Sequence, residues 1–363
     1  MLNPKNPFSQ NYVEARQRFL KAAQSVNANL KSQLISSRGA QGEELTIDIA
    51  TVGAENPERT ILLTSGLHGV EGCLGSAIQT AWLEKLRVMP ISFDTTAVVL
   101  VHALNPYGFS WQRRVNENNV DLNRNFIFPQ QQFCGSHPGL KNMPWLQRPV
   151  SPDNKLFILE LHTLWTILSM GFSTMKNSIH FGQFDYPSGL FWGGHKYEET
   201  TQIIQDQIDS WTRQTQHILH IDYHTGIGKY GRCHFLTFGQ KEIKKAFWFL
   251  AQFGAGVSTV GTEYFSDGKP VGSMADWLVL HFGEQKKQYI YLAAEYGTYS
   301  SLRAFKALYQ ENRFWDHPGY EHESAKKELI EFFCPTDPVW RERCVTDGLL
   351  MISKALQIIR EFP

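Results

Sequence analysis

The chain has 363 residues, and its 35 Lys and Arg balance 35 Asp and Glu, so the formal net charge is zero. No segment concentrates basic residues, which argues against nucleic acid as a partner. Residues 1–16 lack the apolar core of a secretory signal, and no uncharged apolar stretch approaches the length of a membrane span. We therefore expect a soluble, cytoplasmic protein with no membrane partner.

Apolar spacing and turn residues predict the first elements in the order helix, strand, strand, helix and strand, at residues 11–26, 45–52, 60–65, 72–86 and 97–103. Residues 97–103 are apolar throughout except for His102, as in a strand covered on both faces. Later segments predict strands at 218–224, 233–238, 258–265 and 288–295, with helices at 240–253 and 271–281. Strands that alternate with helices predict a layered α/β fold with a mixed, mostly parallel sheet.

We expect a single catalytic α/β domain that spans residues 1–363. Residues 127–192 are rich in Pro, Gly, Gln and aromatic residues around one helical stretch at 156–170, and we interpret them as an insertion that helps to form the substrate pocket. Residues 302–363 show no strand pattern and predict two or three helices. The five cysteines are odd in number and form no Cys-x-x-Cys pair, so free thiols are expected.

The pattern His-x-x-Glu occurs three times, at His68/Glu71, His195/Glu198 and His281/Glu284. Only the first pair follows directly on a predicted strand, at the carboxyl end where open α/β sheets place their ligand sites. Glycines at positions 66, 69 and 72 allow a tight turn there and a close approach to a ligand.

The predicted strand at 218–224 alternates in polarity, and its polar residues gather at its carboxyl end. His224 precedes Thr225 and Gly226, so it can reach the same edge of the sheet as His68. His220 is the alternative on the same face, deeper in the strand. Two histidines and a glutamate hold zinc while leaving a coordination position for water, which is the arrangement of catalytic zinc.

Arginine and asparagine occur together twice in a segment rich in turn formers, first at Arg113 and Arg114 and then at Asn123 and Arg124. Arginine binds carboxylates with two parallel hydrogen bonds, so these residues are candidates for substrate binding. Asp121 is a candidate for orienting His68, because a metal-bound histidine usually donates its second ring N–H to a carboxylate or a carbonyl.

Glu295 ends an apolar run that is typical of a central strand. Burial raises the pKa of a carboxyl group toward neutrality, and such a group is suited to act as a general base on water.

Together these motifs resemble the zinc carboxypeptidase family typified by carboxypeptidase A, in a bacterial branch of mostly unassigned function. The resemblance covers about residues 44–299 and rests on four segments, His68-x-x-Glu71, Arg114-x-Asn116 with Val120 to Phe126, Asp222-x-His224-Thr225-Gly226, and Glu295-x-Gly297-Thr298. It implies an eight-stranded sheet between helices. It also implies one zinc per chain, held by His68, Glu71 and His224.

The same resemblance implies roles for the remaining residues: Arg114 as stabiliser of the oxyanion, Asn123 and Arg124 as carboxylate binders, and Glu295 as base and proton shuttle. The family's substrate-side tyrosine has no matching motif here, although Tyr230 and Tyr264 are available.

The leading functional hypothesis is a zinc-dependent hydrolase of an amide bond, most closely a carboxypeptidase acting on small peptides. One alternative is a deacylase of N-acyl amino acids, similar to aspartoacylase and succinylglutamate desuccinylase, which needs the same metal and the same carboxylate binder. A second is a metal- or peptide-binding protein without catalysis. The presence of Glu295 argues against this last class, because binding alone does not require a base.

Overall fold

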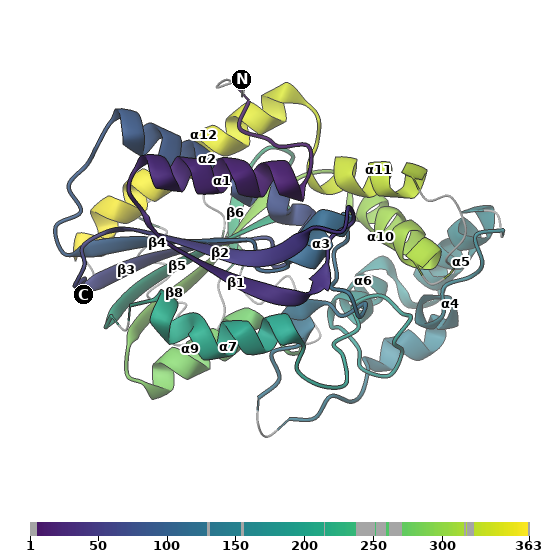
Figure 1. Cartoon of the computed structure of the whole chain (residues 1–363). Coiled ribbons are helices and arrows are strands. Elements are labelled where there is room, and N and C mark those ends of the chain that lie inside the picture. The colour runs from purple at the N-terminus through teal and green to yellow at the C-terminus, as the bar shows by residue number, and fades with distance from the viewer. Residues whose placement is uncertain are drawn as a thin grey trace.

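The structure is a computed structural model that describes residues 6–128, 131–153, 156–213, 215–236, 259–260, 271–315 and 323–361, with the single residues 251 and 317. The described strands form one eight-stranded mixed sheet with helices on both faces (Figure 1). They are β1 (Asn29–Arg38), β2 (Glu44–Gly53), β3 (Arg59–Ser65), β4 (Thr96–His102), β5 (His217–Gly226), β6 (Cys233–Leu236), β7 (Thr259–Val260) and β8 (Gln288–Gly297).

The strand order is β1-β2-β4-β3-β5-β8-β6-β7. The central strands β4, β3, β5 and β8 are mutually parallel, while β1 pairs with β2, β2 with β4 and β6 with β8 in antiparallel fashion. The predicted fold, a mixed and mostly parallel eight-stranded sheet between helices, is confirmed. Because β3, β5 and β8 are neighbours and parallel, their carboxyl ends meet at one edge of the sheet.

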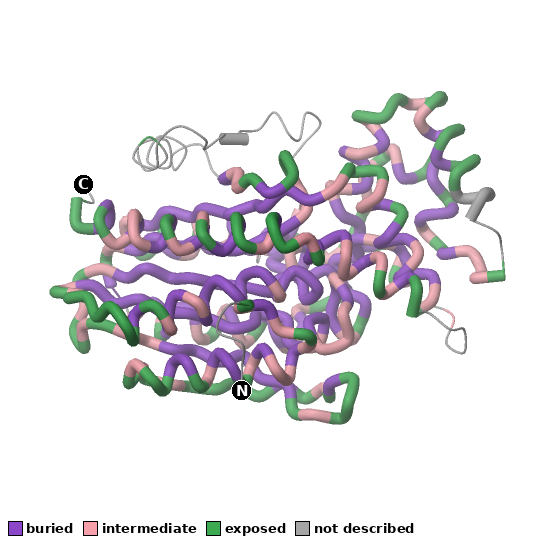
Figure 2. The backbone as a smooth tube through the Cα atoms, turned by 90° about the horizontal axis from the view of Figure 1, so that it is seen from above, coloured by how far each residue is buried: buried purple, intermediate pink, exposed green. Residues whose placement is uncertain are grey.

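The helices pack on both faces of the sheet (Figure 1). Helices α1, α2 and α12 share one apolar core with Leu219 and Ile221, whereas α7 and α9 share another core with Ile218, as expected when side chains alternate along β5. Figure 2 shows the resulting buried layer through the centre of the molecule. The described helices are α1 (Tyr12–Ser25), α2 (Gly72–Val88), α3 (Pro106–Trp111), α4 (Pro144–Gln147), α5 (Leu156–Met170), α6 (Phe172–His180), α7 (Glu199–Trp211), α9 (Met274–Glu284), α10 (Ser301–Trp315), α11 (Glu323–Phe333) and α12 (Pro338–Ile358).

Strand β1 and helices α3, α4, α6 and α7 were not predicted. Strand β1 lies at the edge of the sheet and is mostly exposed, so it carries little apolar signal. Helix α7 does have apolar spacing, at Ile204, Ile208 and Trp211, that could have revealed it. Nearly all of the helix expected at 240–253 and most of the strand expected at 258–265 lie outside the described residues.

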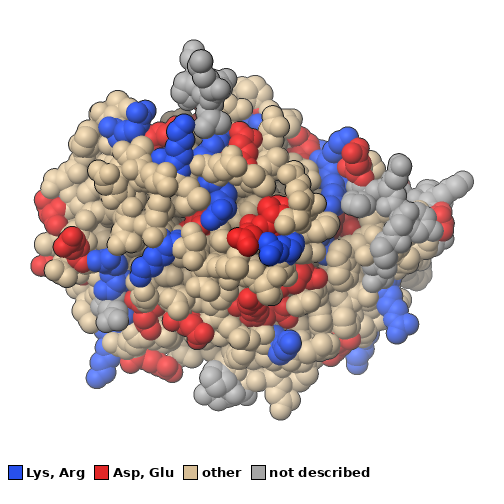
Figure 3. Space-filling model, in the orientation of Figure 1, with Lys and Arg blue, Asp and Glu red and all other residues tan. Residues whose placement is uncertain are grey.

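The predicted helices and strands that fall on the described residues are present in the structure. Helix α5 occupies the helical stretch expected within the insertion, and α10, α11 and α12 form the C-terminal portion. The five cysteines are free, as predicted. No helix in the described part of the chain is long and apolar enough to cross a membrane. Figure 3 shows acidic and basic side chains interspersed over the visible face.

Candidate active site

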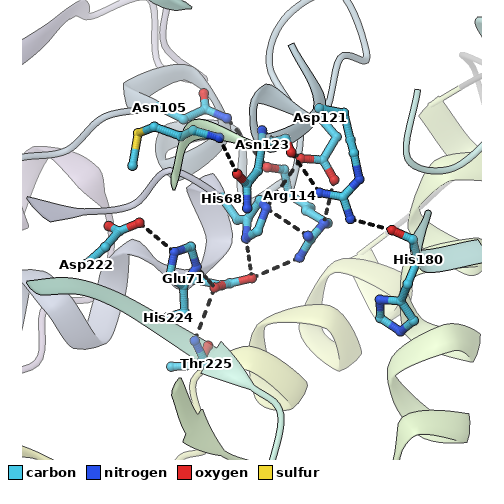
Figure 4. Close-up of polar contacts among 12 residues, drawn as sticks. His68, Glu71, Asn105, Arg114, Asp121, Asn123, His180, Asp222, His224 and Thr225 are labelled. Atoms are coloured by element: carbon cyan, nitrogen blue, oxygen red, sulfur yellow. Dashed lines mark hydrogen bonds and ion pairs between the residues drawn. The ribbon is translucent and has the colours of Figure 1, made fainter. Parts of the chain in front are cut away.

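The three predicted metal ligands converge at the carboxyl ends of β3 and β5 (Figure 4). His68 and Glu71 lie in the turn between β3 and α2, and His224 lies near the end of β5. One ligand atom from each lies within 4.8 Å of the others. Glu71 is central, with Oε1 2.9 Å from Nδ1 of His68 and Oε2 3.1 Å from Nδ1 of His224.

The turn that carries these ligands depends on a glycine. A Cβ atom at Gly69 would lie 2.0 Å from the carbonyl carbon of Gly108, so no side chain fits there. The close approach lets the N–H groups of Gly69 and Val70 donate to the carbonyls of Arg114 and Arg113. The metal-ligand turn is therefore fixed against the segment that supplies the arginines.

Each histidine has a carboxylate behind it. Nε2 of His68 lies 3.3 Å from Oδ1 of Asp121, and Nε2 of His224 lies 2.7 Å from Oδ2 of Asp222. Both carboxylates are fully buried. Burial acts to raise their pKa values, but His224 holds the pKa of Asp222 at about 2, and Arg114 with His68 keeps that of Asp121 well below its usual range.

This pairing turns Nδ1 of both rings toward Glu71. The geometry is that of histidines oriented for a metal by carboxylates. Asp121 thus lies where the sequence predicted it. Asp222 was not predicted to orient a ligand, although its position two residues before His224 on the same face of β5 signals it.

The three residues fit a divalent metal. Nδ1 of His68 is buried and makes no hydrogen bond, although Glu71 is near. Burial acts to raise the pKa of Glu71, but the two histidines keep it far below its usual value, so the group is a carboxylate. Two imidazoles and one carboxylate form a three-ligand set typical of zinc that keeps a position open for substrate or water.

Arg114 and Glu295 face the same cluster. Arg114 donates from Nη1 to Oε1 of Glu71 at 3.0 Å and from Nε to Oδ2 of Asp121 at 3.3 Å. Its Nη2 lies 2.7 Å from Nε2 of His68. Both Arg114 and Glu295 line the cavity beside the ligands.

Glu295 owes its place to sheet register, because it pairs with His224 across the parallel strands β5 and β8. Its side chain is buried, and Oε2 has no hydrogen-bond partner. Burial, reinforced by the nearby charge of Glu71 and opposed by His224, raises the pKa of Glu295 to about 7. The chain thus holds a carboxyl group that can exchange a proton near neutral pH at this site.

Asn123 and Arg124 also line the cavity. The guanidinium of Arg124 is buried and donates to two backbone carbonyls, those of Asn123 and His180, each at 2.7 Å. Burial lowers the pKa of Arg124 to about 10, and the nearby charge of Asp121 partly opposes this shift. Oδ1 of Asn123 accepts a hydrogen bond from the backbone of Met274. A buried guanidinium whose hydrogen bonds go to neutral carbonyls favours binding of an anion.

The structure does not bring Arg113 to the cavity. Its buried guanidinium donates from Nε to Oε1 of Glu311 in α10 at 2.6 Å and from Nη2 to Oδ1 of Asn119 at 3.1 Å. Trp315 lies against the same guanidinium. Arg113 was expected to bind substrate, but these contacts make it an internal ion pair.

The alternatives raised by the sequence lie elsewhere. The ring of His220 contacts the hydroxyls of Thr64 and Tyr289 within the sheet. The ring of His195 contacts Trp192 edge-on, and His281 pairs with Asp209. The hydroxyl of Tyr230 donates to Asp337, outside the cavity lining. Tyr264 lies outside the described residues.

The cavity has a volume of about 520 Å³. The insertion contributes to its wall, as the sequence predicted, while Trp192 stays outside it. Residues of the insertion in the lining are Phe172, Met175, Lys176, Ile179, His180 and Phe191.

Comparison with known proteins gives a family and a fold. A family model described as a protein of unknown function (DUF2817) matches residues 8–347. No curated protein matches the sequence. Bovine thrombin-activatable fibrinolysis inhibitor, solved in complex with tick carboxypeptidase inhibitor, aligns with a TM-score of 0.55 and 11% identity over 98% of each chain.

A second structure of thrombin-activatable fibrinolysis inhibitor aligns with a TM-score of 0.54 and 10% identity, over 96% of this chain and 74% of that one. Carboxypeptidase A from Helicoverpa armigera aligns with a TM-score of 0.47 and 13% identity, over 97% and 76% of the two chains. Identities this low establish the fold alone. The chain belongs to the DUF2817 family, and its fold is that of the zinc carboxypeptidases.

Proposed function

We propose that the chain is a zinc-dependent hydrolase of an amide bond adjacent to a free carboxylate, as in the reaction of a metallocarboxypeptidase. One observation carries the proposal: the cluster of His68, Glu71 and His224 opens on a cavity whose wall also holds Glu295 and Arg124. Metal ligands, a base and an anion binder thus share one space.

A zinc ion bound by this cluster would lower the pKa of its water to about 7 and polarise the scissile carbonyl. Glu295 is proposed to take the proton of the attacking water on its carboxylate and to pass it to the departing amine nitrogen. A pKa of about 7 supports this role, because general bases work best near the operating pH.

Arg114 is proposed to stabilise the oxyanion that forms from the carbonyl oxygen. It is already directed toward the cluster by its contacts with Glu71 and Asp121. Arg124 is proposed to bind the substrate carboxylate, with Asn123 beside it. The support for Arg124 is its buried guanidinium, whose hydrogen bonds go to neutral carbonyls.

Two substrate classes satisfy this arrangement, a small peptide with a free carboxyl terminus and an N-acyl amino acid. The second is favoured by one observation, the predominance of apolar side chains on the cavity wall formed by α6, α10 and α11. A binding protein without catalysis is disfavoured, because it has no use for a buried carboxyl group such as Glu295 at the metal cluster.

The experiment compares wild type with Glu295→Gln, which preserves shape and hydrogen bonding but removes the base. Metal content and hydrolysis of a mixed pool of peptides and N-acyl amino acids are measured. We expect one zinc per chain in both proteins and a loss of activity of at least ~100-fold in the variant. Glu58→Gln is the matched control, because the carboxylate of Glu58 is exposed and lies outside the cavity lining. It should change neither the metal content nor the activity. Equal activity of Glu295→Gln and wild type would contradict the proposal.

A further inference from the structure

The cavity wall divides by element into a charged part and an apolar part. The charged part comes from the strand ends and from the segment around Arg114 and Arg124. Helices α6, α10 and α11 contribute the apolar part, in which nine apolar side chains accompany only Lys176, His180 and Ser301. The nine are Phe172, Met175, Ile179, Leu302, Ala304, Phe305, Leu308, Phe332 and Phe333.

The apolar part is continuous. Most of its members belong to one packed cluster, which joins the insertion to α10 and α11. Phe191 belongs to the same cluster and marks its boundary with the charged part, because the guanidinium groups of Arg114 and Arg124 lie 5.2 and 5.9 Å from its ring centre. A ligand with its carboxylate on Arg124 therefore meets apolar surface directly beyond the charged groups.

The apolar wall also reaches solvent. Phe172 and Leu302 line the cavity and are 44% and 50% exposed. Helix α5, which packs on α6, also carries exposed apolar side chains, at Leu164, Trp165 and Leu168. The apolar wall therefore opens to solvent at Phe172 and Leu302.

Such a wall discriminates between the two substrate classes. A peptide that extends from the scissile bond along it would bury main-chain N–H and C=O groups against side chains that offer few hydrogen-bond partners, which is costly. An alkyl chain has no such groups and gains free energy from each methylene that leaves water.

We propose that the substrates are N-acyl amino acids with a long apolar acyl chain, with the carboxylate at Arg124 and the acyl chain along α6, α10 and α11. This inference rests on the proposed function. In the reaction, water adds to the amide carbonyl and the C–N bond breaks. The products are a fatty acid and a free amino acid, whose nitrogen receives the proton carried by Glu295.

The first test measures kcat/KM of the zinc-loaded protein on N-acetyl, N-octanoyl and N-lauroyl forms of one amino acid, and on a tripeptide that ends in the same amino acid. Each added methylene should raise kcat/KM by about fourfold until the wall is covered. The tripeptide should be slower than the octanoyl compound. Equal rates across the acyl series, or a faster tripeptide, would overturn the inference.

Variants at the solvent end of the wall locate the acyl chain. Phe172→Ser and Leu302→Ser change exposed positions of the wall and should flatten the rise in kcat/KM between the octanoyl and lauroyl compounds. Leu350→Ser is the matched control, because Leu350 is 56% exposed on α12 and absent from the lining. If kcat/KM rises with acyl length as steeply in these two variants as in the control, the placement of the acyl chain is wrong.

Binding measurements distinguish a failure of this inference from a failure of the proposed function. The affinity of the acyl series for metal-loaded Glu295→Gln is measured by calorimetry, which needs no turnover. Affinity that rises with chain length, without hydrolysis by wild type, would support the acyl site and refute the hydrolase. Peptide hydrolysis without any dependence on acyl length would retain the hydrolase and refute the acyl site.

Discussion

The pair Arg113–Glu311 offers a stability test that is independent of activity. Arg113 is 2% exposed, and Glu311 binds it through two contacts of 2.6 and 3.3 Å between α10 and the segment before the active site. The carbonyl of Arg113 also accepts the N–H of Val70, between the metal ligands. Glu311→Gln removes the charge that neutralises this guanidinium while keeping the side chain's shape.

Loss of one partner from a buried ion pair costs about 3–5 kcal/mol, because the remaining charge is left uncompensated. Asn119 still accepts one hydrogen bond from the guanidinium, and the amide oxygen of glutamine can accept another, so we expect about 3 kcal/mol. A chain of 363 residues has an unfolding entropy of about 0.8 kcal/mol/K. The melting temperature should therefore fall by about 4 °C.

The assay is urea and thermal unfolding of the variant beside Glu328→Gln. Glu328 makes a similar contact with Arg303 at 2.6 Å, but both side chains are more than a third exposed, so the control should lose less than about 1 kcal/mol. The double change Arg113→Met with Glu311→Leu should recover most of the stability and keep the KM of wild type. A loss in Glu311→Gln no larger than in the control would refute the reasoning. A raised KM in the stable double variant would restore Arg113 as a substrate binder.

Three further predictions concern the metal, the substrate and pH. Asp222→Asn should weaken zinc binding 10–100-fold in a metal titration, because Asp222 orients His224, whereas His220→Asn should leave the stoichiometry unchanged. Arg124→Ala should weaken binding of a carboxylate-bearing inhibitor by about 1.5–3 kcal/mol. Amidation of the inhibitor's carboxylate should weaken its binding to wild type by a similar amount and its binding to the variant only slightly. If the two losses of binding free energy are additive, the assignment of Arg124 is contradicted. Burial lowers the pKa of His102 to about 4, so below pH 6.5 only the unfolded state takes up this proton. The free energy of unfolding should then decline from pH 6.5 to 4 by up to about 3 kcal/mol from this residue, and His102→Gln should show a shallower decline in urea titrations; an identical pH profile would contradict it.

Much of the site could be predicted because its residues lie at the carboxyl ends of strands. His68, His224 and Glu295 each follow an apolar strand pattern, and the strands β3, β5 and β8 prove to be adjacent and parallel. In such a sheet, consecutive strand ends meet at one edge, so three local patterns are enough to bring their residues together. The pairing of His224 with Glu295 follows from register alone.

The sequence alone could not distinguish the roles of Arg113 and Arg114. Arg113 and Arg114 are neighbours with the same chemistry, yet one pairs with Glu311 in the interior and the other faces Glu71. The choice depends on α10, which lies almost 200 residues later in the chain. Strand β1 was missed for a different reason, since an exposed edge strand needs no apolar periodicity.

The proposed chemistry and the proposed specificity come from different parts of this fold. The metal ligands and Glu295 are held by the central sheet, where a shift in any strand would disturb two neighbours. The apolar wall comes from α6 in the insertion and from α10 and α11, which pack on one another outside the sheet. Side chains on these helices can change size or polarity without moving the metal cluster. We therefore expect substrate range to depend on the segments whose positions depend most on distant parts of the chain.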